Sequence, residues 1–291
     1  MSNFILSTSS TSDLPESYAQ KHDLVVLPFS FIISGQEYKD DFNKSMACRE
    51  FYDRLRSGEI SKTSMINSQD FEVSFRAGLD AGRDILHIEF SSALSGSYQN
   101  AKTVADQLNQ EYKDQKVIVI DSLSASLGLG LLIDYAVSLR DEGKDIDGVA
   151  SWVEQNKLHM IHWFTVDDLN HLRRGGRVSG VTAFLGTMLH IKPVMDVDDL
   201  GRLIPHFKVR GRKKAIAALF QHMQQDIVNP EGQRVFISHG DCIDDANLLK
   251  QMILDGLPGI KDVLINSVGP VIGSHSGPGT LALFYMGKKR F

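Results

Sequence analysis

The first half of this 291-residue sequence alternates short apolar runs with segments of helical spacing. Strand-like runs occur at residues 3–6, 24–27, 84–90 and 116–121. Continuous Val and Ile runs separated by amphipathic helices are typical of a parallel sheet with helices on both faces. The pattern therefore predicts a doubly wound α/β domain, with its helices at residues 46–57, 69–81, 98–112 and about 125–142.

The pattern changes after Gly143. Two runs of alternating character, 191–197 and 203–209, flank an Asp-Asp-Leu-Gly turn at 198–201. A short Asp/Gly turn between alternating runs is a hairpin signal, so we expect antiparallel members in a second, mixed sheet. Its other elements are expected at residues 147–156, 158–165, 212–227, 234–239, 244–257, 260–268 and 280–286. We predict two α/β domains, 1–155 with a parallel sheet and 156–291 with a mixed sheet.

Composition excludes several classes of function. The net charge of −5 does not indicate a nucleic-acid surface, and no window approaches the roughly 20 apolar residues that span a bilayer. Residues 1–6 predict a first strand rather than a signal peptide. Cys48 and Cys242 lack metal-ligand spacing and are interpreted as reduced structural thiols, which indicates a reducing, cytoplasmic compartment. We expect no metal and no cofactor.

Ser95 and Gly96 belong to the first of four segments that concentrate glycine, serine or histidine. The segment 91–97 follows a predicted strand and precedes a predicted helix. A helix N-terminus offers unpaired N–H groups, which suit a carboxylate or a phosphate. The alternative is that one serine caps the helix and the others fill a turn.

Thr63 and Ser64 form the second segment, interpreted as a loop end that supplies hydroxyl hydrogen bonds to an anionic head group. Arg177 lies in the third, 172–179, where two glycines end a short helix and Ser179 is expected to cap the next one. Arg177 offers a charge that persists at any relevant pH, although a solvated basic loop explains the segment equally well.

His275 lies in the fourth segment, 269–279, which holds four glycines and two prolines. We expect a non-repetitive backbone there, with the histidine projecting from it into a functional site. A further cluster, Arg210, Arg212, Lys213 and Lys214, is either a solvated helix start or a docking patch for an acidic partner.

Together these segments resemble the DegV family of fatty-acid-binding proteins over essentially the whole chain. The similarity is carried by Ser-Ser-Thr-Ser-Asp-Leu-Pro at 9–15, Ser-Ala-Leu-Ser-Gly-Ser-Tyr at 92–98, Leu-Arg-Arg-Gly-Gly-Arg-Val-Ser at 172–179, Ile-Lys-Pro at 191–193, Val-Arg-Gly-Arg-Lys-Lys-Ala at 209–215 and Gly-Ser-His-Ser-Gly-Pro-Gly at 273–279. Two segments depart from the family pattern. Ser9 stands where aspartate is common, and Met65-Ile66 replaces Gln-Pro close to the expected pocket, where its effect would be on acyl preference.

The resemblance implies a two-domain DegV-like fold that holds a long-chain fatty acid such as palmitate between the domains. It implies that Thr63, Ser95 and the Gly96 amide bind the carboxylate, with Ser64, Arg177 and His275 near the head group. It also implies a carrier without catalytic residues of its own. A separate ATP-binding kinase subunit, docking in part through Arg210, Arg212 and Lys213, would convert the fatty acid to an acyl phosphate for phospholipid synthesis.

Two other functions remain open. A hydrolase would use Ser95 or Ser276 with His275, but it needs a carboxylate that orients the histidine and a serine on an elbow, and neither is evident in the sequence. A lipid-responsive regulatory sensor is the second alternative. Pocket size would depend on which large side chains point inward, the candidates being Phe29, Phe31, Phe184, Met188 and Phe284.

Overall fold

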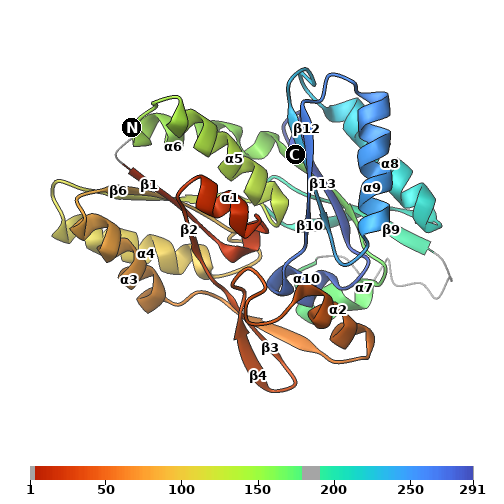
Figure 1. The fold of residues 1–291 in the computed structure, drawn as a ribbon, viewed down its shortest axis with the longest axis horizontal. Coiled ribbons are helices and arrows are strands. Elements are labelled where there is room, and N and C mark those ends of the chain that lie inside the picture. Colours follow the sequence, from red (N-terminus) through yellow and green to blue (C-terminus); the bar gives the residue numbers. More distant parts are fainter. Residues whose placement is uncertain (1–3, 179–190, 291) are drawn as a thin grey trace.

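The computed structural model of the chain describes residues 4–178 and 191–290 and contains two main sheets that lie side by side (Figure 1). The first sheet has four parallel strands in the order β2-β1-β6-β7. Its strands are β1 (Phe4–Ser9), β2 (Leu24–Leu27), β6 (Asp84–Glu89) and β7 (Val117–Asp121). Helices α3 (Ser68–Asp80) and α4 (Ser97–Glu111) pack on one face, and α5 (Leu127–Asp141) and α6 (Ile146–Asn156) on the other. The predicted doubly wound sheet is confirmed.

Local sequence signals set the helix starts around this sheet. The side chain of Asn67 accepts a hydrogen bond from the Asp70 amide at the start of α3, and Asp145 does the same for Gly148 at the start of α6. Each cap satisfies one of the N–H groups that a helix start leaves without a partner.

The second sheet has six strands in the order β10-β9-β8-β13-β11-β12 and mixes parallel with antiparallel pairs, as expected. Its strands are β8 (Met160–Thr165), β9 (Ile191–Val197), β10 (Leu203–Arg210), β11 (Arg234–His239), β12 (Asp262–Ser267) and β13 (Leu281–Met286). The predicted hairpin is β9–β10, which carries a register shift between Pro205 and Phe207. Helices α8 (Arg212–Asp226) and α9 (Ile243–Gly256) cover one face of this sheet.

Helix α5 lies between the two sheets and joins their cores. Leu129, Leu131 and Ile133 are fully buried, as expected of a helix with apolar residues on every side. Gly128 allows a close approach, because a Cβ atom there would lie 2.2 Å from Nε2 of His162 on β8. One continuous core thus includes side chains of both sheets. The domain division at 155/156 stays a prediction.

The prediction of a loop at residues 62–64 is wrong, because these residues belong to a strand of a third, antiparallel sheet. This sheet was not predicted from the sequence. It consists of β3 (Ser30–Ile33), β4 (Gln36–Lys39) and β5 (Ser61–Ser64), in the order β4-β3-β5. Its strands have four residues each, and β5 is entirely polar, so no apolar period announces it. Pairing with the buried strand β3 stabilises β5. The short helix α1 (Glu16–Lys21) was also missed, whereas α2 (Cys48–Arg56) was expected.

The non-repetitive backbone expected around His275 is also wrong, since residues 270–276 form helix α10 (Pro270–Ser276). Pro270 at the first helical position supplies a suitable φ and lacks only an N–H that would have no partner there. Gly277, with φ of 79°, follows the last turn. Burial of α10 against β3, β5 and α2 overrides the low helix propensity of its glycine and serines. The remaining elements are α7 (Leu169–Gly175) and the 3-10 turns η1 (Ser10–Ser12) and η2 (Lys157–His159).

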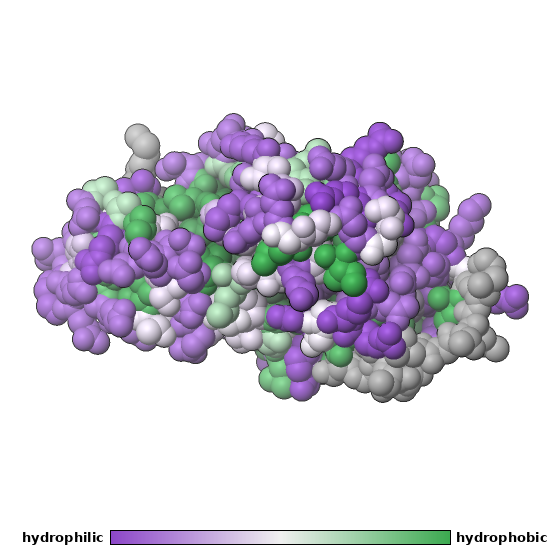
Figure 2. All heavy atoms as spheres, turned by 90° about the horizontal axis from the view of Figure 1, so that it is seen from below, coloured by the Kyte–Doolittle hydropathy of each residue, from purple (hydrophilic) through white to green (hydrophobic). Residues whose placement is uncertain are grey.

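Both cysteine thiols are free, and burial raises the pKa of each to about 12, consistent with structural thiols. Within residues 4–178 and 191–290, no helix has the length and apolar character needed to cross a membrane. Hydrophilic side chains cover most of the face seen in Figure 2, where apolar groups form small patches at the left and near the middle.

Candidate functional site

A cavity of about 540 Å³ lies between the first sheet with its adjoining loops and the second sheet. Its volume is within the range of small-molecule sites. Its wall is largely apolar and is formed by side chains from both halves of the chain: Phe29, Met65, Phe90, Leu94, Phe164, Leu172, Val197, Leu203, Val268, Val271, Ile272, Ala282 and Phe284. Such a surface suits an alkyl chain.

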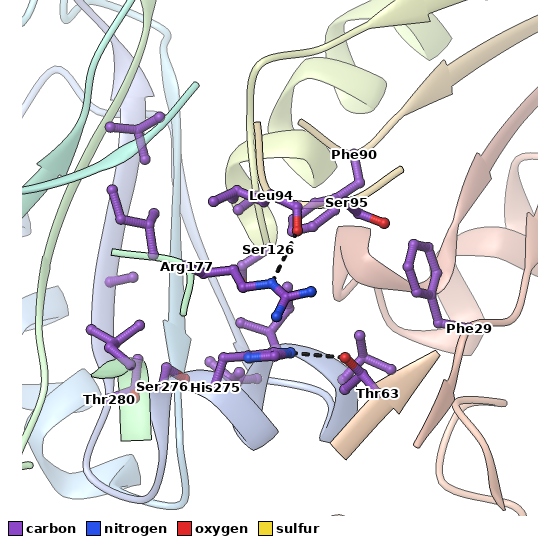
Figure 3. Close-up of a pocket in the computed structure, with 18 of the residues that line it drawn as sticks. Phe29, Thr63, Phe90, Leu94, Ser95, Ser126, Arg177, His275, Ser276 and Thr280 are labelled. Carbon is purple, nitrogen blue, oxygen red and sulfur yellow. Dashed lines mark hydrogen bonds between the residues drawn. The ribbon is translucent and has the colours of Figure 1, made fainter. Parts of the chain in front are cut away.

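All six residues predicted for the head group line this cavity: Thr63, Ser64, Ser95, Gly96, Arg177 and His275. They come from four separate segments, namely β5, the loop before α4, the residues after α7, and α10. Figure 3 shows Thr63, Ser95, Arg177 and His275 gathered around one part of the cavity, with the Arg177 guanidinium between the Ser95 loop and the Thr63–His275 pair.

The Thr63 hydroxyl lies 2.8 Å from Nε2 of His275. The other ring nitrogen, Nδ1, is buried and has no hydrogen-bond partner among the described residues. Burial and the nearby Arg177 lower the pKa of His275 to about 4, so the imidazole is neutral near pH 7. The ring fits only because residue 175 is glycine: a Cβ atom there would lie 2.3 Å from Nδ1.

Ser95 and Gly96 stand at the N-terminus of the 15-residue helix α4, with Gly96 as its cap. The Ser95 Oγ atom accepts a hydrogen bond of 3.2 Å from the Ser97 amide. The hydroxyl proton of Ser95 is therefore free to point into the cavity. The helix start adds its partial positive charge. Met65, one of the departures from the family pattern, lies over this point, since a Cβ on Gly96 would be 3.0 Å from its sulfur.

Arg177 is held by backbone carbonyls rather than by a carboxylate. Its Nε donates to the Leu94 carbonyl at 3.3 Å (Figure 3), and its guanidinium also donates to the Gly175 carbonyl. These bonds fix the guanidinium beside the cavity and leave its charge uncompensated among the described residues. Such a group can attract an anion.

Three polar groups elsewhere in the cavity wall, Ser126, Thr280 and His162, form hydrogen bonds within the protein, whereas the buried Ser276 hydroxyl has no hydrogen-bond partner among the described residues. Ser126 donates to Asp13 and lies 3.0 Å from the hydroxyl of Ser238. The Thr280 hydroxyl donates to the Gly277 carbonyl, and burial lowers the pKa of His162 well below its usual range. These three groups neither carry charge into the cavity nor require a polar ligand.

The segment 9–15, which carries part of the family resemblance, has a structural role in these contacts. Asp13 also accepts a hydrogen bond of 2.9 Å from the Gly269 amide, just before α10. It thereby ties the loop after β1 to the helix that carries His275. Ser9, the other departure from the family pattern, is fully buried and donates to Glu89 at 2.7 Å.

The apolar wall was only partly foreseen. Phe29 and Phe284 line the cavity, whereas Phe31 packs in the core beside Phe51 and Tyr38. Phe184, Met188 and Ser179 lie outside the described residues. Phe90 and Leu94 were missed, although their place directly after a buried strand was a usable signal.

The basic cluster is less uniform than its sequence suggests. Arg212 is committed to intramolecular ion pairs, 2.8 Å from Asp245 and 3.5 Å from Asp167. Arg210, Lys213 and Lys214 are exposed. A docking patch here would rest on those three side chains. The part of the chain that the structure describes contains no group of three His, Cys, Asp or Glu side chains arranged for a metal ion.

Comparison with known proteins places this architecture in a family. Residues 4–288 match the family model described as "Uncharacterised protein, DegV family". A DegV domain-containing protein of Clostridium perfringens is 42% identical over 287 residues, covering 99% of this chain and 98% of that protein.

Solved structures agree with the match to the family model. The structure reported as fatty acid binding of a DegV family protein from Thermus thermophilus has 31% identity and a TM-score of 0.89, and the similarity covers 98% of this chain and 99% of that one. DegV of Bacillus subtilis, described as a fatty acid binding protein, has 25% identity and a TM-score of 0.85, covering 99% of this chain and all of that one. The chain therefore belongs to the DegV family.

Proposed function

We propose that this protein binds one long-chain fatty acid, such as palmitate, with its alkyl chain in the apolar cavity and its carboxylate beside Thr63, Ser95 and the Gly96 amide. The observation that carries the proposal is an apolar cavity with neutral hydrogen-bond donors and a helix start at one place in its wall. Its relatives from Thermus thermophilus and Bacillus subtilis are described as fatty-acid-binding proteins.

The energetics favour this division of roles. Each buried methylene contributes roughly 0.8 kcal/mol, so about fourteen of them contribute on the order of 11 kcal/mol before ordering costs. A buried carboxylate without partners is strongly unfavourable, and hydroxyl and amide donors remove that penalty. Because His275 is neutral near pH 7, Arg177 is the positive group in this part of the wall.

We further propose that the protein is a cytoplasmic carrier, and that a separate ATP-binding kinase subunit phosphorylates the bound fatty acid. A carboxylate oxygen would form a bond to the terminal phosphorus of ATP. The bond from that phosphorus to the β–γ bridging oxygen would break, and ADP would leave. Exposed Arg210 and Lys213 are candidates for docking the kinase subunit.

A self-sufficient hydrolase is disfavoured by the site. The His275 ring contacts Thr63 through Nε2, and no described carboxylate approaches Nδ1 to orient it. The Ser95 hydroxyl oxygen is engaged with the Ser97 amide rather than with the histidine.

Organic extraction of the purified protein followed by mass spectrometry tests the binding proposal. We expect about one fatty acid per chain, and a clear loss of retention in Thr63→Val and Ser95→Ala. Ser92→Ala is the matched control, because Ser92 is exposed in the same loop and does not line the cavity. Normal retention in both test variants would show that the carboxylate lies elsewhere.

Addition of a kinase subunit and ATP separates the carrier from a lipid-responsive sensor. Carrier function predicts a hydroxylamine-trappable acyl phosphate that depends on both additions. A sensor would retain the fatty acid unchanged.

A further inference from the structure

A small cavity, of about 140 Å³, lies apart from the apolar cavity and shares no lining residue with it. It forms where four segments meet: η1 with the start of α1, the residues after β4, the start of α2, and the end of β12 with Gly269. Its polar lining consists of carboxylates, amides and hydroxyls, together with the Cys48 thiol. Among the described residues that line it, none is a lysine, an arginine or a histidine. We call it the acidic cavity.

Three carboxylate oxygens converge on one point in front of Gly269. A Cβ atom placed on this glycine would lie 2.8 Å from Oδ1 of Asp13 and 3.3 Å from both side-chain oxygens of Asp40. Only the absence of a side chain at residue 269 leaves this point open. Both aspartates are buried, with exposed fractions of 5% and 8%. Two carboxylates this close repel each other when both are ionised, and burial strengthens the repulsion because it removes solvent screening.

The protein supplies hydrogen-bond partners for Asp13 but not fully for Asp40. The Gly269 amide donates to Oδ1 of Asp13 at 2.9 Å. Oδ2 of Asp40 is buried, lines the acidic cavity and has no hydrogen-bond partner among the described residues. Lys44, on the loop after β4, pairs with Glu16 at 2.6 Å instead. A buried carboxylate oxygen without a partner is costly, so the two aspartates require either a shared proton or a cation between them.

The oxygen atoms around this point are the donors that hard divalent cations prefer. Mg²⁺ in particular is bound through one or two carboxylates and keeps several water molecules. At roughly 30 Å³ for each water, the cavity has room for an ion and about four waters. Asn266 can add a further ligand: its Nδ2 donates to the Asp13 carbonyl at 2.7 Å, and its side-chain oxygen is the other polar atom that it brings to the cavity.

We propose that the acidic cavity binds one Mg²⁺ ion through Asp13 and Asp40, with water and neighbouring amide and hydroxyl oxygens completing its coordination. Only two of these ligands are carboxylates, so the site does not require the group of three His, Cys, Asp or Glu side chains that the described residues lack. The proposal departs from the expectation of no metal and does not depend on the fatty-acid function. Because Gly269 directly precedes α10, the ion would fasten the loops after β1 and β4 to this helix.

Calorimetry and thermal unfolding of the chelator-treated full chain test the proposal. MgCl₂ and, in parallel, CaCl₂ are titrated at an ionic strength held constant with NaCl, so that general screening does not change. Asp40→Asn removes one charge and keeps the shape of the side chain. Asp41→Asn is the matched control, because Asp41 is the next carboxylate in the chain and does not line the cavity. Gly269→Ala is a second test variant. Its Cβ would fill the point on which the oxygens converge, and a φ of −66° suits alanine.

We expect the parent to bind one Mg²⁺ ion and to gain about 2–3 °C in its unfolding midpoint at a roughly tenfold excess over Kd. Asp40→Asn and Gly269→Ala should each weaken Mg²⁺ binding at least about tenfold, whereas Asp41→Asn should change it less than about twofold. Mn²⁺ accepts the same ligands, so its electron paramagnetic resonance spectrum should show bound ion with the parent and free ion with Asp40→Asn.

Three results would overturn the proposal. No heat and no midpoint shift in the parent up to about 10 mM MgCl₂ would mean that the two carboxylates share a proton instead. Equal losses of affinity in Asp40→Asn and Asp41→Asn would assign the binding to general surface charge. Tighter binding of Ca²⁺ than of Mg²⁺ would refute the identity of the ion. None of these outcomes changes whether the chain retains a fatty acid, so the proposed function stands or falls separately.

Discussion

The Thr63 hydroxyl and Nε2 of His275 lie 2.8 Å apart, although 212 residues separate them along the chain. One belongs to a short strand in the first half and the other to a short helix near the end. Their contact lies in the wall of the apolar cavity, at the place where we propose that the carboxylate binds. Several measurable properties depend on this pair and on the residues packed around it.

Protonation of His275 should lower stability in acid. Its pKa in the folded protein is about 4, below the ordinary value of 6.5, so the unfolded state binds more protons between these limits. Protonation of His275 therefore lowers the free energy of unfolding as pH falls from 6.5 to about 4, and it has no such effect at higher pH. In delipidated protein, urea unfolding measures the free energy of unfolding of the parent and of His275→Gln. Between pH 7.5 and pH 5, the parent should lose about 2 kcal/mol of stability relative to the variant. A difference independent of pH would contradict this assignment.

Gly175→Ala should weaken fatty-acid retention by roughly tenfold, because the new Cβ would displace the His275 ring and break its contact with Thr63. Gly176→Ala is the matched control. Gly176 has φ of 67°, and a Cβ there would meet no neighbouring atom within 4 Å, so that variant should lose about 1 kcal/mol of stability and keep the lipid. The amount of extracted lipid and the midpoint of thermal unfolding are measured for both glycine variants. Equal retention in the two would refute the role given to Gly175.

Ala282→Leu should shift the bound fatty acids toward shorter chains, by roughly two or three carbons, because it fills part of the apolar cavity. Successive side chains of a strand point to opposite faces, and Leu283 packs in the core on the other side of the sheet. Leu283→Met is therefore the control and should leave the chain-length distribution unchanged. Mass spectrometry of the extracted lipid measures both. An unchanged distribution in Ala282→Leu would mean that the alkyl chain does not pass this strand.

Asp134→Ala should destabilise the fold by about 2–3 kcal/mol. Asp134 is buried on α5, accepts a hydrogen bond of 2.7 Å from Tyr18 and pairs with Arg234 of β11 at 2.6 Å. Its loss leaves a half-buried guanidinium without compensation, and the partial exposure of Arg234 moderates the cost. Adding Arg234→Leu should recover part of the loss, as measured by urea unfolding. A double variant less stable than Asp134→Ala would contradict this explanation.

Periodicity alone was sufficient for the long elements. Strands such as β6 and β11, and helices such as α3 and α4, carry apolar residues at a clear period, and their predicted bounds agree with the structure to within one or two residues. The hairpin β9–β10 followed from its Asp/Gly turn. The short elements β5 and α10 were not predictable in this way. The first is polar throughout and the second contains glycine and serine, so tertiary pairing and burial decide their conformations.

The order of residues along the chain was enough to establish the fold class, and the family resemblance carried by its local motifs was enough to name the six residues that line the proposed head-group region. Folding in three dimensions was needed to bring Thr63 against His275, to make room for the histidine ring at Gly175, and to gather the carboxylate oxygens of Asp13 and Asp40 in front of Gly269. The physical reason is that these relationships depend on how separate elements pack. Packing joins residues far apart in the chain, and no local period or motif records such a contact.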